Sequence, residues 1–261
     1  MLRAMRSAAS GMKAQQLYLD TVANNLANVN TTGFKRARIG FEDLLYQQVS
    51  APGDGTEGTK PAGLEVGHGS RAVDTQRILS QGDSEVTENP LDLLIQGDGF
   101  FQVTRPDGTQ AYLRDGAFRL DAEGRIVTSN GYVLQPEISL PQDTVSLAVT
   151  EDGRIFVEQD GTPGSTEIGQ ILLARFTNPA GLTAEGQNLY RETGASGTAQ
   201  LSAPGELGVG TMIQGALERS NVQVVEEMIH MIVAQRAFEV NSKAIESADS
   251  MMRTAVNMRP A

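Results

Sequence analysis

The chain has 261 residues, enough for more than one folding unit, and its hydrophobic fraction of 39% lies somewhat below that of a typical compact domain. Its net charge of -11 argues against nucleic acid and anionic lipid surfaces as partners, because both repel an acidic protein. The absence of Cys excludes disulfides and thiolate metal sites, and no apolar stretch approaches the roughly 20 residues of a membrane helix, so membrane insertion is not expected.

Residues 1–30 contain the first predicted element, a helix with a narrow apolar seam. Apolar side chains recur every three or four residues from Leu2 to Leu26, interrupted only by Gln16, which is typical of coiled-coil packing. The segment Val29-Asn30-Thr31-Thr32-Gly33 should end this helix. Basic residues near the start of this helix oppose its dipole, so we expect it to be stably folded only when several helices pack together. No continuous apolar run follows them, so a Sec signal peptide is not expected.

Residues 31–71 are predicted to form an extended arm or connector. Its second half, from Tyr46 to Arg71, is rich in Gly, Pro and Thr and has few apolar anchors. A loop of this length is unusual within a compact domain. We therefore expect the Tyr46–Arg71 arm to be disordered or held by a partner.

Residues 72–219 are predicted to form an outer domain of antiparallel strands. Short apolar runs alternate with turn signals, and no helical period separates them, which argues against βαβ topology. The expected strands are Leu91–Ile95, Phe100–Thr104, Arg125–Thr128, Tyr132–Gln135, Val145–Val149, Arg154–Glu158 and Ile171–Phe176. The expected turns are Asp107-Gly108, Asn130-Gly131, Asp152-Gly153 and Asp160-Gly161.

Residues 220–261 are predicted to form a second, longer helix. Apolar residues from Val222 to Met258 recur about every 3.6 residues and so share one face, with Ser220 or Asn221 as a possible cap. Together with residues 1–30 this helix would make a discontinuous, coiled-coil-like α domain, and the overall fold class is α+β. An ordinary helical hairpin that closes a monomer is the alternative.

The sequence contains only weak candidates for a metal site, a dinucleotide site or a catalytic site. Glu226 and His230 could share a helix face, but a third metal ligand is not evident nearby. The Gly97-Asp98-Gly99 turn leads into a strand, so it lacks the context of a dinucleotide site. Acidic pairs suited to an enzyme of the cell-wall space exist, but nothing singles out two of them. We therefore predict no catalytic, cofactor-binding or metal site.

Two motifs near opposite ends of the chain are specific enough to suggest a family. The first is ANNLANVNTTGFKR at residues 23–36, and the second includes SNV at 220–222, EEMI at 226–229 and AQRAFEVNSK at 234–243. Together they resemble the signatures of bacterial flagellar axial proteins, which are rod and hook subunits. The resemblance implies assembly roles for Asn24, Asn25, Leu26, Asn28, Gly33, Phe34 and Lys35, and for Asn221, Val222, Glu226, Met228, Ile229, Gln235, Arg236, Phe238, Asn241 and Ser242.

The middle of the chain is similar to distal-rod subunits of this family. The stretches that carry the similarity are DLLIQGDGFF at 92–101, YLRDGAF at 112–118, NPAGL at 178–182, NLY at 188–190 and QGALE at 214–218. The resemblance implies a structural subunit of the distal rod, which assembles into a helical tube, transmits torque from the motor to the hook and encloses the export channel. A proximal-rod or hook subunit is the alternative, and no enzyme activity or cofactor is implied.

The same resemblance implies partners and a location. The partners would be further copies of the chain, proximal rod subunits, the hook protein, the bushing proteins of the peptidoglycan and outer-membrane rings, the rod cap and the export apparatus. The chain would leave the cell through the flagellar type III apparatus, without a cleaved signal peptide, and reside in the periplasmic rod of the basal body.

Overall fold

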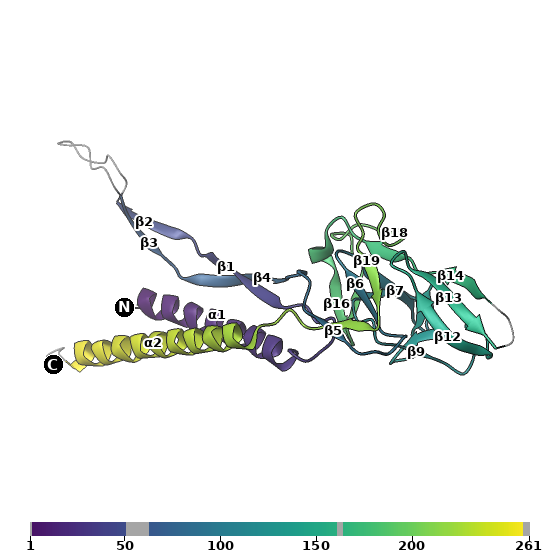
Figure 1. Ribbon diagram of the computed structural model, residues 1–261. Helices are drawn as coiled ribbons and strands as arrows, with labels where there is room; N and C mark the ends of the chain where they lie inside the picture. Colours follow the sequence, from purple (N-terminus) through teal and green to yellow (C-terminus); the bar gives the residue numbers. More distant parts are fainter. Residues whose placement is uncertain (1, 51–62, 161–163, 258–261) are drawn as a thin grey trace. The chain divides into compact units, whose positions relative to one another are not determined.

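The computed structural model describes residues 2–50, 63–160 and 164–257, and the chain divides into two compact units. The helical unit comprises 1–27, 37–76 and 223–261, and the β unit comprises 28–36 and 77–222 (Figure 1). The chain therefore crosses from one unit to the other after residues 27, 36, 76 and 222. The three domains expected from the sequence, with boundaries near 30, 71 and 219, remain a prediction.

Two long helices form much of the helical unit: α1 (Leu2–Ala27) and α2 (Val224–Asn257). They lie side by side and run antiparallel, since Gly11 of α1 lies against Asn241 of α2 and Asn25 binds Glu227 (Figure 1). A Cβ atom on Gly11 would come within 3.1 Å of Asn241 Nδ2, so the missing side chain permits this close approach. Both predicted helices are thus confirmed.

The face that α1 buries differs from the seam expected from the sequence. Ala8, Ala14 and Val22 are buried, whereas Ala9 and Gln16 of the predicted seam are exposed. The buried side chains are small, so α1 packs closely while it buries little apolar surface. The 3-4 spacing predicted a helix correctly, but coiled-coil packing along that seam stays a prediction.

Two pairs of strands complete the helical unit: β1 (Ala37–Asp43) with β4 (Ser70–Arg77), and β2 (Tyr46–Ser50) with β3 (Leu64–Gly67). The hairpin of β2 and β3 lies within the predicted Tyr46–Arg71 arm, of which 51–62 lie outside the described residues. Tyr46, Val49 and Leu64 are 58%, 54% and 58% exposed, so the arm presents apolar side chains on its surface.

The β unit consists of short strands and one turn of 3₁₀ helix. Their bounds are β5 Ser84–Val86, β6 Leu93–Gln96, β7 Phe100–Thr104, β8 Gln110–Leu113, β9 Phe118–Leu120, β10 Ile126–Thr128, β11 Val133–Gln135, β12 Thr144–Val149, β13 Arg154–Gln159, β14 Ser165–Gln170, β15 Leu173–Arg175, η1 Pro179–Gly181, β16 Thr183–Gly186, β17 Leu189–Arg191, β18 Gln200–Ser202, β19 Thr211–Gln214 and β20 Ala216–Glu218.

The main sheet has the order β16-β17-β8-β7-β11-β10-β9, and β15 pairs with both β7 and β18. Strands β12, β13 and β14 form a second sheet, while β19 pairs with β6 and β20 with β5. These pairs are antiparallel, as the sequence predicts.

The core of the β unit follows from the alternation of side chains along β7 and β8. Phe101 points into the larger core cluster, where its ring meets that of Phe118 edge-on with centroids 5.0 Å apart. Phe100 and Tyr112 point to the opposite face, into a smaller cluster with Phe176. Successive residues of a strand face opposite sides, so one hairpin supplies both clusters.

The predicted strands and three of the four predicted turns are confirmed, whereas Gly161 of the predicted Asp160-Gly161 turn lies outside the described residues. Each predicted strand overlaps an observed one, and β7 matches its predicted bounds. Gly108, Gly131 and Gly153 adopt positive φ angles of 81°, 81° and 77°, which suit tight turns between strands. The pairing of β1 with β4 was not predicted: residues 31–71 were expected to form an extended arm or connector, and β4 lacks a regular alternation of polar and apolar residues.

Candidate assembly site

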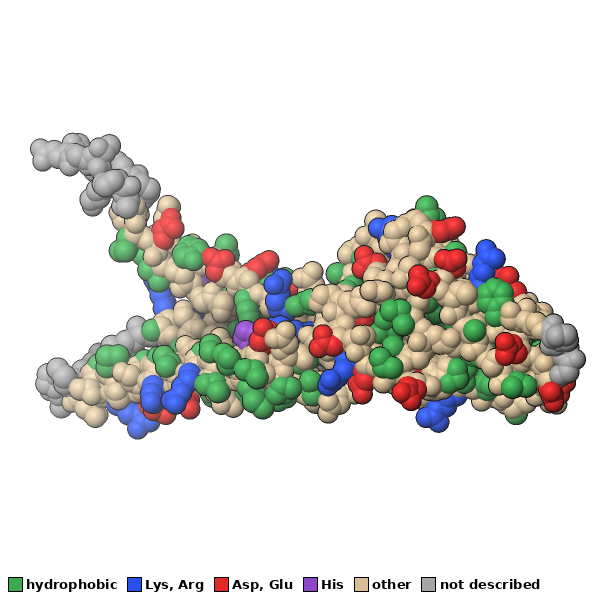
Figure 2. Space-filling view, viewed as in Figure 1, with side chains coloured by type: hydrophobic (Ala, Val, Ile, Leu, Met, Phe, Trp, Pro, Cys, Tyr) green, Lys and Arg blue, Asp and Glu red, His purple; other side chains and the backbone are tan. Residues whose placement is uncertain are grey.

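Apolar side chains line the exposed surface of α2. Val225 is 71% exposed, Ile229 55%, Ile232 57% and Val233 59%, whereas Ala234 is buried. Figure 2 shows apolar side chains gathered along this helix. Since these side chains are already partly covered, burying the rest of one of them would contribute about 1–2 kcal/mol. We call Val225, Ile229, Ile232 and Val233 the apolar face of α2, and it is suited to packing against another chain.

The predicted assembly residues of the C-terminal motif divide by exposure. Val222 is buried, and Asn221, Asn241 and Ser242 are half-buried. The exposed ones are Glu226, Met228, Ile229, Gln235, Arg236 and Phe238. Those on α2 thus lie mainly at its surface, although their role in assembly stays a prediction. The predicted assembly residues include only Ile229 of the apolar face; they omit Val225, Ile232 and Val233, which lie between the motif stretches.

The N-terminal motif divides differently. Asn25 and Lys35 are 1% exposed and Gly33 is also buried. Asn24 is exposed, and Leu26, Asn28 and Phe34 are half-buried. A buried side chain does not reach a neighbouring chain, so any contribution of the buried three to assembly acts through the shape of this chain.

Gly33 shows how the motif enters the β unit. Its φ angle is 66°, in the region that favours Gly, and its N–H donates to the Glu218 carbonyl at 2.8 Å. A Cβ atom here would lie 2.7 Å from Asp115 N and 2.8 Å from the Arg114 carbonyl carbon. The glycine therefore lets the motif approach the end of β8 more closely than any other residue would.

Lys35, Arg114 and Glu218 form a buried charge cluster next to this turn. The Lys35 Nζ atom lies 2.5 Å from Glu218 Oε1, and Arg114 Nε lies 2.6 Å from Glu218 Oε2. The Gly82 N–H also donates to Glu218 Oε1 at 2.8 Å. One carboxylate thus joins a residue of the N-terminal motif, the end of β8 and the end of β20.

Burial and charge act together on this cluster. Burial lowers the pKa of Lys35, and the neighbouring Glu218 carboxylate offsets this only in part. Burial alone would raise the pKa of Glu218, but Arg114 and Lys35 outweigh it and hold that pKa below its ordinary value. Glu218 is therefore ionised near neutral pH and works as a structural anchor.

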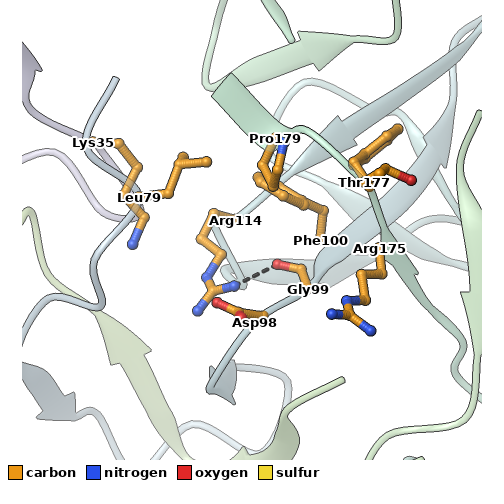
Figure 3. A pocket seen from close by; sticks show the side chains of 10 residues that line it. Lys35, Leu79, Asp98, Gly99, Phe100, Arg114, Arg175, Thr177 and Pro179 are labelled. Atoms are coloured by element: carbon orange, nitrogen blue, oxygen red, sulfur yellow. Dashed lines mark hydrogen bonds between the residues drawn. The ribbon is translucent and has the colours of Figure 1, made fainter. Parts of the chain in front are cut away.

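A cavity of about 190 Å³ opens beside the charge cluster. Figure 3 shows Lys35 and Leu79 on one side of it and Arg175 and Thr177 on the other. The Arg114 guanidinium donates to the Gly99 carbonyl and to two further carbonyls as well as to Glu218. Its donors are largely used within the chain, so the cavity does not offer this cation to a ligand.

His230, the candidate metal ligand from the sequence, does not lie in a cluster of metal-binding side chains within the described residues. His230 meets the ring of Tyr18 edge-on with centroids 6.2 Å apart. Over the described ranges, no three His, Cys, Asp or Glu side chains are grouped so that they could hold a metal ion. Neither described helix combines the length and the apolar character that crossing a bilayer requires.

Three stretches of the chain match known protein families. Residues 5–35 match the flagella basal body rod protein family, and residues 94–157 match the D1 domain of the flagellar hook protein FlgE/F/G family. Residues 213–258 match the C-terminal region of the flagellar basal body rod FlgEFG proteins. The matches thus fall on both terminal motifs and on the β unit.

Curated relatives are similar over the whole chain. The flagellar basal-body rod protein FlgG of Borreliella burgdorferi is 49% identical over 263 residues, which cover 99% of each chain. The protein of that name from Caulobacter vibrioides is 45% identical over 261 residues, which cover 99% of this chain and 100% of its own. The flagellar hook-basal body complex protein FlhP of Bacillus subtilis is less similar, at 28% identity over 268 residues.

Proposed function

The chain belongs to the flagellar basal-body rod proteins, and we propose that it is the subunit of the distal rod, the section nearest the hook. Membership makes the chain a structural subunit of the flagellar rod, located in the basal body, and not an enzyme, in agreement with the sequence analysis. Full-length similarity to rod proteins named FlgG supports the distal position. The arm after Tyr46 supports it as well, since it resembles the extra segment by which distal-rod subunits differ from hook subunits.

The apolar face of α2 carries the proposal of self-assembly. Val225 and Val233 are 71% and 59% exposed, and exposed apolar surface of this kind is characteristic of interaction sites. Helices of neighbouring copies cover this face in the assembled rod, with the terminal helices lining the export channel in a coiled-coil-like arrangement. Contacts that join different faces of successive copies do not close on themselves, so they generate a helical tube.

The rod requires partners beyond copies of this chain. A flagellar rod protein assembles with other rod and hook components. In our proposal proximal rod subunits lie at one end and the hook protein at the other, with the peptidoglycan-ring and outer-membrane-ring proteins as bushings around the shaft. The rod cap and the type III export apparatus act during assembly, and export uses no cleaved signal peptide.

The Tyr46–Arg71 arm is proposed to bridge adjacent subunits and to stiffen the rod. In its described part Tyr46, Val49 and Leu64 are 58%, 54% and 58% exposed. A lone two-stranded hairpin is only marginally stable in water, so a neighbouring subunit would stabilise it. Cells with the arm deleted should build curved or unstable rods. Straight rods of full strength would refute this role.

Electron microscopy of basal bodies from cells that lack the gene tests the function as a whole. A rod that stops short and carries no hook is the expected result. A rod missing from its base would instead indicate a proximal subunit, and a complete rod without a hook would indicate a hook subunit. A complete rod with its hook would refute the proposed function.

A further inference from the structure

In the helical unit, the side chain of Asn25 binds the backbone of Ala37. The Oδ1 atom of Asn25 accepts from the Ala37 N–H at 2.9 Å, and its Nδ2 atom donates to the Ala37 carbonyl at 2.9 Å. The same Nδ2 atom also donates to Glu227 Oε2 at 3.3 Å. The amide of Asn25 thus acts on Ala37 as a neighbouring strand would, by pairing with both of its backbone groups.

In the β unit, the side chain of Asn221 binds the residue just before Ala37. Its Oδ1 atom accepts from the Arg36 N–H at 2.8 Å. Its Nδ2 atom donates to the Ile78 carbonyl at 2.8 Å and to the Ser80 carbonyl at 3.0 Å. The Ile78 N–H in turn donates to the Arg36 carbonyl at 2.8 Å. The Asn221 amide therefore joins Arg36, the last residue before the chain leaves the β unit, to Ile78 and Ser80, which follow its return to that unit.

Arg36 and Ala37 are the two residues between which the chain leaves the β unit and enters the helical unit. Successive peptide groups at this crossing are thus held by two Asn side chains, each within its own unit. We propose that Asn25 and Asn221 are positioning residues: Asn25 holds the backbone of Ala37 within the helical unit, and Asn221 holds that of Arg36 within the β unit. Force on the helices then enters the β unit through a chain segment whose two residues are each held by a side chain of their own unit.

The residue type suits this task. An Asn side chain carries one acceptor and two donors on a short stem, so it can replace a strand partner where no strand lies. Asn25 is 1% exposed, and a buried amide that keeps its partners stays in place. Alanine at either position would leave the backbone groups of Arg36 or Ala37 without these partners.

The residues that brace the crossing come from both ends of the chain. Asn221 and Glu227 belong to the C-terminal motif, while Asn25 and Arg36 belong to the N-terminal one. The crossing is therefore braced only after both ends of the chain have folded. This explains on physical grounds why both motifs contain Asn at these positions, beside their surface residues.

Hydrogen exchange of the purified full chain tests the bracing directly. Asn221→Ala should speed exchange of the Arg36 amide, and Asn25→Ala that of the Ala37 amide, each by about tenfold, as the loss of one net hydrogen bond predicts. Amides in β7 and β13 should exchange unchanged in both variants. Asn130→Ala, a change of the same kind at an exposed turn residue, is the control. Unchanged exchange at residues 36 and 37 in the two test variants would overturn the proposal.

A second variant, Asn25→Asp, tests the same contacts if Asn25→Ala does not fold. Asn25→Asp keeps the acceptor for the Ala37 N–H but places negative oxygens against the Ala37 carbonyl and Glu227. Adding Glu227→Gln removes the like charge and supplies a donor to the new carboxylate. Exchange at Ala37 should be fast in the single variant and at least partly recovered in the double one. No recovery would contradict the assigned geometry.

Swimming under load tests the consequence, which rests on the proposed function as a rod subunit. Cells with Asn25→Ala or Asn221→Ala should build rods and swim normally in dilute medium, and should lose speed in viscous medium more steeply than wild type or Asn130→Ala. Equal load dependence despite faster exchange would overturn the role in force transmission. Failure of the rod assignment itself would appear instead in the deletion experiment above, with the exchange results unaffected.

Discussion

Glu218 shows how one buried side chain can decide a local structure. It accepts from Lys35 and Arg114, and its backbone carbonyl accepts from Gly33. Breaking a buried ion pair by removing one partner costs more than the pair contributes, because the remaining charge stays buried and uncompensated. The effect of changing Glu218 should therefore far exceed that of changing a surface carboxylate.

The first prediction concerns Glu218→Gln. This variant keeps the size of the side chain but leaves the Lys35 and Arg114 charges without a counter-ion, so the free energy of unfolding should fall by about 3–5 kcal/mol. Guanidinium unfolding of the full chain measures this. Glu137→Gln, which removes one partner of an exposed pair with Arg125, should change stability by less than about 1 kcal/mol. Equal effects of the two variants would contradict the role of the cluster.

The second prediction concerns acid. The pKa of the Glu218 carboxyl is held below its ordinary value of 4.5, mainly by Arg114 and Lys35 against the effect of burial. Its contribution to stability is therefore complete above pH 4.5 and is lost as the pH falls through the lower pKa of the folded state. The stability difference between wild type and Glu218→Gln should be constant near neutral pH and shrink in acid. Unfolding curves at several pH values measure it, and a difference that grows in acid would refute it.

At the scale of elements, the two terminal helices are unequal. α1 buries small residues such as Ala8 and Ala14, while α2 exposes a row of larger ones that includes Ile229 and Ile232. Pairing of the two helices within one chain therefore leaves much apolar surface uncovered. The helices are suited to a structure in which further helices surround them.

The third prediction tests the apolar face of α2 with Ile232→Glu. The side chain is 57% exposed, so the isolated chain should keep its fold, with stability changed by less than about 0.5 kcal/mol. In cells, a charge buried between helices should prevent rod assembly and abolish motility. Circular dichroism checks the fold, and electron microscopy of basal bodies checks the rod. Ile232→Leu should assemble normally, and rods built from Ile232→Glu subunits would count against this interface.

At the scale of the whole molecule, the two units differ in how they are stabilised. The β unit has a continuous core that includes Phe101, Phe118 and Ile155, all almost fully buried. Among the described side chains of the two helices, the buried apolar ones are Ala and Val: Ala8, Ala14, Val22, Ala234 and Ala248. Since buried apolar area is the main stabilising term, the β unit should be the more stable of the two.

The fourth prediction follows from this difference. Heating the purified chain should unfold the helical unit first and the β unit later, in two transitions. Circular dichroism at the helical band should report the first one, and limited proteolysis with mass spectrometry should show early cleavage within residues 1–27 and 223–261. A single transition, with simultaneous cleavage in both units, would show that they unfold together.

Local chemistry made much of the architecture predictable. The periodicity from Leu2 to Leu26 and from Val222 to Met258 was sufficient for two helices, because the spacing of apolar residues reflects helix geometry directly. Gly108 and Gly131 marked hairpin turns because few other residues tolerate positive φ. The motifs near both ends indicated the family, and the relatives confirmed it.

Long-range contacts were decided only by the tertiary structure. The pairing of Lys35 with Glu218 joins residues 183 positions apart, and that of Asn25 with Glu227 joins residues 202 apart. Nothing in the local sequence distinguishes these carboxylates from many exposed ones, because burial depends on which segments meet in space. For the same reason the periodicity of α1 predicted a helix but not which of its side chains, such as Ala8 and Ala14, are buried in the single chain. By itself the sequence thus determined the elements and the family, through periodicity and backbone preference, whereas the tertiary structure decided which residues brace the chain and which remain exposed for assembly.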